Sequence, residues 1–194
     1  MANAHPVLDG RWVRLEPLGP AHVAPLSRVA LDPELWRWTV SQVRTEADLR
    51  RYVEAALDAA AQGHAVPFAI FDRASGAAAG STRFGNIDPH HRRLEIGWTW
   101  LGRAFQRTAL NTETKYLMLR HAFEGLGCIR VEFKTDVLNA RSREAIRRLG
   151  AVEEGVLRHH MITESGRVRD TVYYSILAAE WPAVRERLEA RLAR

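Results

Sequence analysis

Hydrophobic residues recur along the chain with two different periods, and the switches between these periods predict an order of strands and helices. Strands are predicted where apolar residues alternate with polar ones or form short runs, at residues 11–17, 66–71, 78–84, 94–101, 129–135, 152–162 and 168–177. Helices are predicted where apolar residues recur every three or four positions, at residues 21–31, 46–61, 110–126, 139–149 and 181–192. We therefore expect an α/β fold, with a mixed central sheet of about seven strands flanked by helices. No repeat or linker is visible, so we expect a single domain over residues 1–194.

The strand at 94–101 carries a carboxylate among apolar and small residues. Its large apolar side chains occupy alternate positions, at Leu94, Ile96, Trp98 and Trp100. Since successive side chains of a strand point to opposite faces, we expect these four in the core and Glu95 on the other face.

A basic loop follows this strand and leads into a helix. The start of a helix presents unpaired N–H groups and the positive end of the helix dipole, which together bind phosphate groups. Arg103 and Arg107 add positive charge to the loop. The segment 102–111 therefore predicts a pyrophosphate site, although a solvated basic loop would have the same composition.

Three motifs resemble the GNAT superfamily of N-acetyltransferases. Residues 106–111 resemble its pyrophosphate loop, Gln/Arg-x-x-Gly-x-Gly/Ala, with Ala109 at the first glycine and Asn111 at the last position. Residues 94–98 resemble the Glu-Ile-Gly-aromatic strand of the branch that includes ribosomal-protein N-terminal acetyltransferases. Residues 139–142 resemble that branch's Asn-x-x-Ser helix start. A late Gly-x-x-x-Asp, at 166–170, also resembles this branch, so the likeness covers nearly the whole chain.

The resemblance implies a GNAT-like fold and acetyl-CoA as co-substrate, with no metal. The residues that it assigns to the cofactor are Trp100, Leu101, Arg103, Gln106, Arg107, Thr108, Ala109, Leu110, Asn111, Asn139 and Arg141. Alanine adopts a positive φ only at a cost, so Ala109 puts the family's loop geometry in question.

The resemblance also implies direct attack of an amine on the thioester, which requires a base and an acid. Glu95 is the first candidate base, because its carboxylate lies on the strand beside the expected thioester. His160, on the hairpin next to His159, is the alternative base. The family's usual acid is a tyrosine, but Ile146 occupies that position, so the hydroxyl of Ser142, one turn earlier, is the candidate donor to the leaving sulfur.

Charge and composition narrow the partners. The formal net charge of +5 falls within residues 101–150, which contain ten Lys or Arg and five Asp or Glu. This local excess favours a small polyanion over nucleic acid as ligand. No apolar run is long enough to span a membrane and no leader is apparent, so we expect a cytoplasmic protein with no membrane partner. The one cysteine, Cys128, is expected in the core.

The acceptor is left open by the sequence. The branch resemblance favours a protein N-terminal α-amino group, but aminoglycosides, polyamines and free amino acids are alternatives. A catalytically silent acyl-CoA sensor is a further alternative, and a homodimer is compatible with the sequence.

Overall fold

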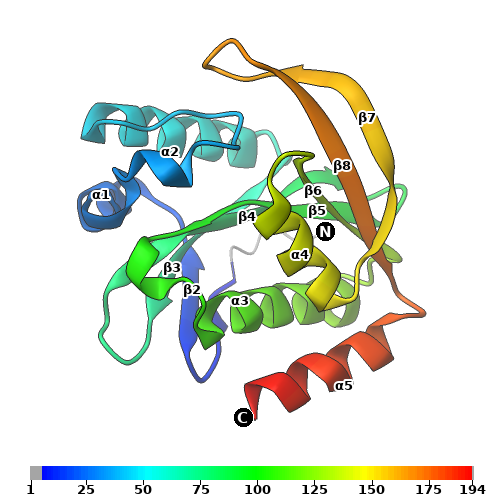
Figure 1. Cartoon of the computed structure of the whole chain (residues 1–194). Helices are drawn as coiled ribbons and strands as arrows, with labels where there is room; N and C mark the ends of the chain where they lie inside the picture. The colour runs from blue at the N-terminus through cyan, green and yellow to red at the C-terminus, as the bar shows by residue number, and fades with distance from the viewer. Residues whose placement is uncertain (1–5, 194) are drawn as a thin grey trace.

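Every predicted strand and helix is present in the computed structural model, which describes residues 6–193 (Figure 1). The strands are β1 Leu8–Asp9, β2 Val13–Pro17, β3 Val66–Asp72, β4 Ala78–Asp88, β5 Arg93–Leu101, β6 Arg130–Asp136, β7 Val152–Ile162 and β8 Val168–Leu177. The helices are α1 Val23–Ala30, α2 Glu46–Ala61, α3 Ala109–Arg120, α4 Ala140–Leu149 and α5 Trp181–Leu192. The two-residue β1 was not predicted, because a strand of that length carries no alternation.

The strands form one mixed sheet in the order β1-β2-β3-β4-β5-β6-β8-β7. All neighbours are antiparallel except β5 and β6, which are parallel. This parallel pair is short: residues 93–95 face residues 130–132, and beyond that register the two strands are no longer paired. The carboxyl halves of β5 and β6 therefore separate in the middle of the sheet.

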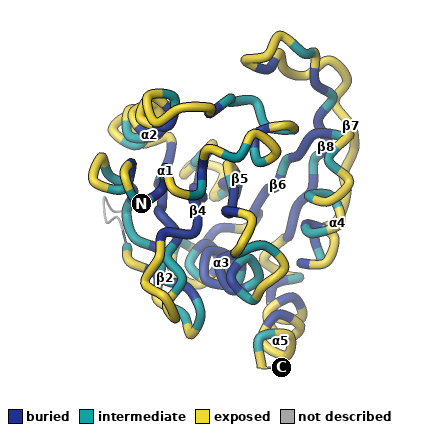
Figure 2. Tube along the Cα trace, turned by 60° about the vertical axis from the view of Figure 1, so that its left-hand side comes forward, coloured by how far each residue is buried: buried dark blue, intermediate teal, exposed yellow. Residues whose placement is uncertain are grey.

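Helices cover both faces of the sheet (Figure 1). Helices α1 and α2 pack on one face, and a buried cluster that includes Leu26, Leu49 and Trp100 lies beneath them. Helices α3, α4 and α5 lie on the other face over the larger cluster, which includes the predicted core residue Cys128. Thr45 caps α2 and forms a reciprocal capping box with Asp48, as its sequence predicts. Figure 2 shows α3 as the most deeply buried helix.

The β7–β8 hairpin extends past the end of β6 toward α2 (Figure 1). Its tip is held by the loop that precedes α2: the Glu164 N–H donates to the Val40 carbonyl at 2.9 Å, and the Gln42 N–H donates to the Glu164 carboxylate at 2.6 Å. The face of the sheet under α2 is therefore bounded by this loop on one side and by the hairpin on the other.

No helix within residues 6–193 is both long and apolar enough to cross a membrane. In the same range, no cluster of three or more His, Cys, Asp or Glu side chains is arranged to hold a metal ion.

Candidate active site

A β-bulge interrupts β5 where it leaves β6. Arg83 of β4 faces Gly97 and Ser81 faces Trp100, so Trp98 and Thr99 together oppose a single residue of β4. Trp98 has φ of +50°, the left-handed region that a bulky residue rarely adopts. A bulge locally disrupts the ladder of hydrogen bonds and leaves its extra residue unpaired. The backbone at this point of the sheet is thus available to a ligand.

The bulge overturns part of the predicted alternation in β5. Leu94 and Ile96 belong to the core under α3 as expected, but Trp100 lies in the opposite cluster, under α1 and α2. Trp98 is 40% exposed and not in the core. The extra residue reverses the facing of every side chain after it, because strand periodicity is two.

The loop after β5 becomes the start of α3 without strain at the alanine. Thr108 caps the helix, its hydroxyl accepting from the Leu110 N–H at 3.3 Å, and Ala109 is the first helical residue. The positive φ of this loop, +62°, falls on Arg107 instead. The concern over Ala109 was therefore misplaced, since a first helical residue needs no positive φ. With Asn111 in the same turn, the helix begins with N–H groups that lack helical partners.

Gln106 connects the two predicted halves of the cofactor site. Its side-chain amide donates to the Leu101 carbonyl at 2.7 Å, and its amide oxygen accepts from Arg141 at 2.5 Å. Arg141 lies in the first turn of α4, which begins after β6. The loop after β5 and the helix after β6 are thus joined across the gap between these two strands.

The start of α4 is capped as its sequence predicts. The Asn139 side-chain oxygen accepts from the Ser142 N–H at 3.0 Å. Among the described residues 6–193, no hydrogen bond of the Ser142 hydroxyl is found, so this hydroxyl is available to a ligand. Ile146 is buried one turn further on.

Three predicted cofactor residues lie at the periphery of this arrangement. Trp100 is buried against Trp36, with ring centroids 5.4 Å apart, and Leu101 is part of the core under α3. Arg103 is exposed and its guanidinium forms an ion pair with Asp32 at 3.1 Å. Only the backbone of Trp100 and Leu101 is therefore placed to meet a ligand, whereas Arg103 retains its charge at the surface.

Glu95 is buried on the face under α2, next to the bulge. Its Oε2 atom accepts from the Asn86 amide at 2.6 Å and pairs with the Lys134 ammonium at 2.9 Å. A Cβ on Gly97 would lie 2.7 Å from Oε1, so this second oxygen lies over Gly97, immediately before the bulge. One oxygen is thus anchored, and the other is directed along β5 toward Trp98.

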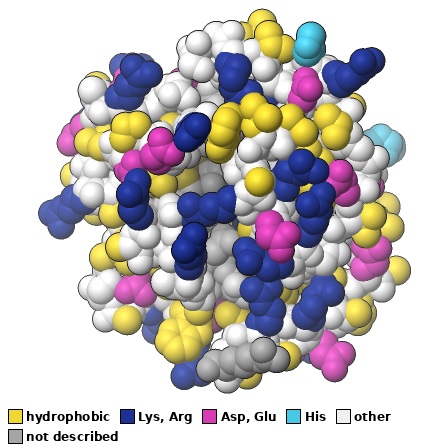
Figure 3. All heavy atoms as spheres, in the orientation of Figure 1, with side chains coloured by type: hydrophobic (Ala, Val, Ile, Leu, Met, Phe, Trp, Pro, Cys, Tyr) yellow, Lys and Arg dark blue, Asp and Glu magenta, His cyan; other side chains and the backbone are white. Residues whose placement is uncertain are grey.

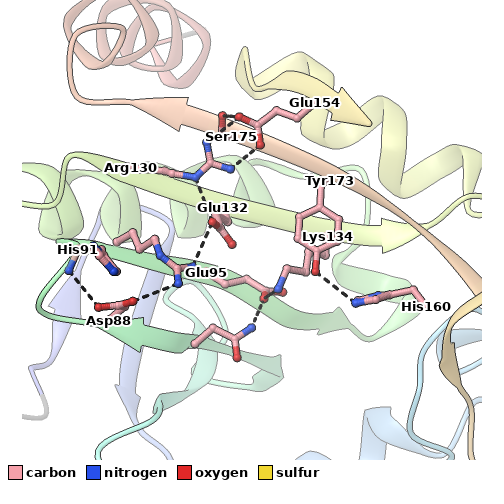
Figure 4. Close-up of polar contacts among 12 residues, drawn as sticks. Asp88, His91, Glu95, Arg130, Glu132, Lys134, Glu154, His160, Tyr173 and Ser175 are labelled. Atoms are coloured by element: carbon pink, nitrogen blue, oxygen red, sulfur yellow. Dashed lines mark hydrogen bonds and ion pairs between the residues drawn. The ribbon is translucent and has the colours of Figure 1, made fainter. Parts of the chain in front are cut away.

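A chain of polar side chains connects the two candidate bases (Figure 4). Burial alone would lower the pKa of Lys134, but the adjacent Glu95 carboxylate and Tyr173 raise it above its ordinary value. The ammonium lies 4.7 Å from the Tyr173 ring centroid, and the Tyr173 hydroxyl lies 3.4 Å from His160 Nε2. Glu95 and His160 are therefore the two ends of one connected network, and not separate sites.

A second network pins β5 and β6 together where they are paired (Figure 4). Glu132 pairs with Arg93 at 3.4 Å and with Arg130 at 3.0 Å, and Arg130 continues to Glu154 on β7. These contacts fix the two strands at their amino ends, so that the separation begins after Glu95.

Positive side chains surround the gap between the strands. Figure 3 shows Lys and Arg side chains gathered around a hollow in the middle of the face that Figure 1 presents. The local excess of positive charge between residues 101 and 150 is consistent with a polyanionic ligand there.

Several residues of this site were not predicted from the sequence. Lys134 lies on a predicted strand, and its alternation with Glu132 could have placed it on the face of Glu95. Asn86 and Tyr173 come from other strands, and nothing local in the sequence connects them with Glu95. The same holds for Arg83, which is buried beside Trp98.

Residues 13–152 match the family described as "Acetyltransferase (GNAT) domain". A curated relative, the "Putative ribosomal N-acetyltransferase YdaF" of Bacillus subtilis (strain 168), is 34% identical over 106 residues. That match spans 55% of this chain and 57% of the relative, so only little more than half of the relative's length is represented.

Two solved structures share the fold. An acetyltransferase from T. thermophilus superposes with a TM-score of 0.88 and 43% identity, covering 96% of each chain. RimJ of Mycobacterium smegmatis, solved in complex with CoA-disulfide, superposes with a TM-score of 0.77 and 24% identity, covering 92% of this chain and 88% of its own. At that lower identity, the second likeness concerns the fold alone.

Proposed function

Because the chain belongs to the GNAT acetyltransferase family, we propose that it transfers an acetyl group from acetyl-CoA to a primary amine by direct attack. Acetyl-CoA, when bound, supplies the activated acyl group and the thiolate leaving group. The observation that carries the proposal is the bulge at Trp98 and Thr99, located where β5 and β6 separate and on the strand that leads into α3. Freed backbone groups at a bulge can bind a carbonyl oxygen, and amides held in place are effective in stabilising the charge that develops there.

The residues around the start of α3 fit a pyrophosphate. The first turn of α3 offers N–H groups, and Arg103, Arg107 and Arg141 supply positive charge around it. The neighbour from M. smegmatis was solved with CoA-disulfide, which supports a CoA ligand for this fold. We assign the phosphates to residues 106–111 and the pantetheine arm to Asn139 at the start of α4.

We assign the base to Glu95. Its Oε1 atom is directed toward the bulge, where it can accept a hydrogen bond from the amine and then its proton. Asn86 and Lys134 hold Oε2 and so fix the orientation of the carboxylate. His160 is the second candidate, and through Tyr173 and Lys134 it lies at the solvent end of the same network.

Ser142 is the proposed donor to the leaving sulfur, and its removal tests this. Ser142→Ala should lower kcat about tenfold and leave the affinity for acetyl-CoA nearly unchanged, because the hydroxyl is needed mainly when thiolate charge develops. Steady-state thiol release and a melting curve with cofactor measure the two quantities. The N-cap is preserved, since Asn139 bonds to the backbone N–H of residue 142. Wild-type kcat would reduce Ser142 to a helix-start residue.

The acceptor class follows from the branch resemblance and from the ribosomal relative. We propose an α-amino group, as at a protein N-terminus, and place the reaction in the cytoplasm. A small amine such as a polyamine or an aminoglycoside is the alternative acceptor. A catalytically silent acyl-CoA sensor would bind the cofactor and release no thiol with any amine.

Binding of acetyl-CoA should raise the melting temperature. At about ten times its dissociation constant, the ligand adds roughly 1.4 kcal/mol to the free energy of unfolding by mass action. For a chain of this length, that corresponds to a shift of roughly 3–6 °C. Replacing Arg107 and Arg141 together with Gln should reduce the shift, whereas Arg120→Gln, on the surface of the same helix α3, is the matched control. An unchanged melting temperature at millimolar acetyl-CoA would contradict the proposal, and thiol release with amines separates an enzyme from a sensor.

A further inference from the structure

Arg83 is a buried cation without a counter-ion. It lies on β4 and is 7% exposed. Among residues 6–193, its Nε has no hydrogen-bond partner, and no carboxylate forms an ion pair with its guanidinium. A buried charge is costly unless it is paired, so a protein retains such a group only where something compensates the cost.

Two aromatic rings hold the guanidinium in place. Its central carbon lies 5.0 Å from the ring centroid of Tyr52 on α2 and 5.0 Å from that of Trp98 at the bulge. The Tyr52 hydroxyl in turn donates to the Trp98 carbonyl at 3.3 Å. The Trp98 ring lies over Gly85, where an added Cβ would come within 2.3 Å of it. The arginine is thus oriented by cation–π contacts, which leave its N–H donors for another partner.

Other buried cations on this face have carboxylate partners within the chain. Lys134 pairs with Glu95 at 2.9 Å, and Arg169 lies 4.0 Å from Asp136, which also binds Arg167. Arg83 differs from all three in having no acid beside it. The missing partner is therefore a feature of this one position and not of the face as a whole.

Arg83 lies beside the proposed reaction centre. It faces Gly97 directly across the β4–β5 pair, and Glu95 Oε1 lies over that same glycine. Directly opposed residues on neighbouring strands have Cβ atoms roughly 5 Å apart. An amine positioned by Glu95 would therefore bring its own substituents close to the Arg83 side chain.

We propose that Arg83 binds a carboxylate of the acceptor, so that the substrates are amines that carry a carboxylate near the reacting nitrogen. This inference rests on the proposed acetyltransferase function. A guanidinium presents a planar fork of N–H groups that matches a carboxylate. The Glu95 charge does not oppose such a ligand strongly, because Lys134 neutralises it. Polyamines and aminoglycosides are disfavoured, since their additional cations would approach Arg83. The remaining sources are a free amino acid and a peptide with an acidic residue beside its N-terminus.

Matched acceptor pairs test the proposal in a thiol-release assay with acetyl-CoA. One pair is alanine and alaninamide; the other is two short peptides that begin Ala-Asp and Ala-Asn. We expect kcat/KM to be about 10- to 100-fold higher for the acid in at least one pair, as for a buried hydrogen bond between charged groups. The pair that shows the preference identifies the source of the carboxylate. In the first pair, the amide has the more easily deprotonated amine, so intrinsic reactivity opposes the expected preference.

Variants assign the preference to Arg83. In Arg83→Gln, the ratio of the two kcat/KM values should fall to about one, and in Arg83→Lys it should be intermediate, because the charge remains and the fork is lost. Arg120→Gln removes the same charge from the surface of α3 and should keep the wild-type ratio. The acetyl-CoA melting shift shows that each variant is folded.

Each outcome has a distinct meaning. Equal rates for acid and amide in both pairs would overturn the carboxylate site and leave the acetyltransferase function intact. A preference that persists in Arg83→Gln would assign the carboxylate to another residue and overturn the role of Arg83. No thiol release with any acceptor would instead contradict the proposed function itself.

Discussion

Glu95→Gln should lower kcat at pH 7 by about 100-fold or more, and the loss should shrink as the pH rises. Glutamine keeps the shape and the contact with Asn86 but cannot accept a proton. Removal of a general base typically costs 10²- to 10⁴-fold. At higher pH the amine loses its proton without help, so the variant approaches the wild-type rate. Rates of thiol release at saturating acetyl-CoA, measured across pH, give the two profiles.

Glu132→Gln is the matched control for this prediction. Glu132 is buried on β6 directly opposite Glu95, and it pairs with Arg93 and Arg130 as Glu95 pairs with Lys134. Its removal should reduce stability without changing the shape of the pH profile, because it lies on the side of Glu95 away from the bulge. A general loss of buried carboxylates is thereby separated from loss of the base.

The alternative base gives the opposite result. If His160 takes the proton, His160→Ala should be the impaired variant, and the limb that it removes should have an apparent pKa near that of imidazole. Because Tyr173 and Lys134 connect the two groups, Tyr173→Phe shows whether the network transmits a proton. Wild-type activity of Glu95→Gln at pH 7 would refute the assignment to Glu95.

The strand β5 shows how far the sequence could predict this site. Alternation placed Glu95 opposite Leu94 and Ile96 correctly, because that half of the strand is regular. It failed after Gly97, since a bulge adds one residue and reverses the facing of those that follow. A bulge arises from pairing with the neighbouring strand, and the sequence of β5 alone does not contain that register.

Contacts between distant segments were equally out of reach. The capping signals of Thr108 and Asn139 are local and were found, but the Gln106–Arg141 bond joins residues 35 positions apart. The partners of Glu95 lie on β4 and β6, and their identity depends on strand order. Local patterns thus predicted the elements and their ends, whereas the site depends on how the sheet assembles them.

Helix α3 departs from its predicted pattern at a residue with large energetic consequences. Its apolar stripe was expected to be buried, but Lys115 is only 7% exposed. The ammonium donates to the Thr99 hydroxyl of the bulge at 2.6 Å, and that hydroxyl lies 2.7 Å from the hydroxyl of Thr82. Burial lowers the pKa of Lys115 from 10.5 to about 7, although the negative charge of Glu95 opposes this. Charge in this position therefore destabilises the fold.

The two lysines of the chain should consequently respond to pH in opposite ways. In lysine Cε NMR spectra, two resonances are expected: one should titrate near pH 7 from Lys115, and the other above pH 10.5 from Lys134, where Glu95 stabilises the charge. A single transition for both lysines above pH 10 would refute the assignment.

Lys115→Met should raise the free energy of unfolding at pH 7 by about 2–4 kcal/mol. The folded state holds fewer protons on Lys115 than the unfolded state between pH 7 and the unfolded value of 10.5, so wild-type stability should rise with pH across that window. The advantage of the variant should accordingly shrink from pH 7 to pH 9 in urea denaturation. Lys134→Met should instead destabilise the protein, because it leaves the Glu95 carboxylate buried without its ion pair. Loss of stability in Lys115→Met at pH 7 would mean that the Thr99 bond outweighs the cost of burying the charge.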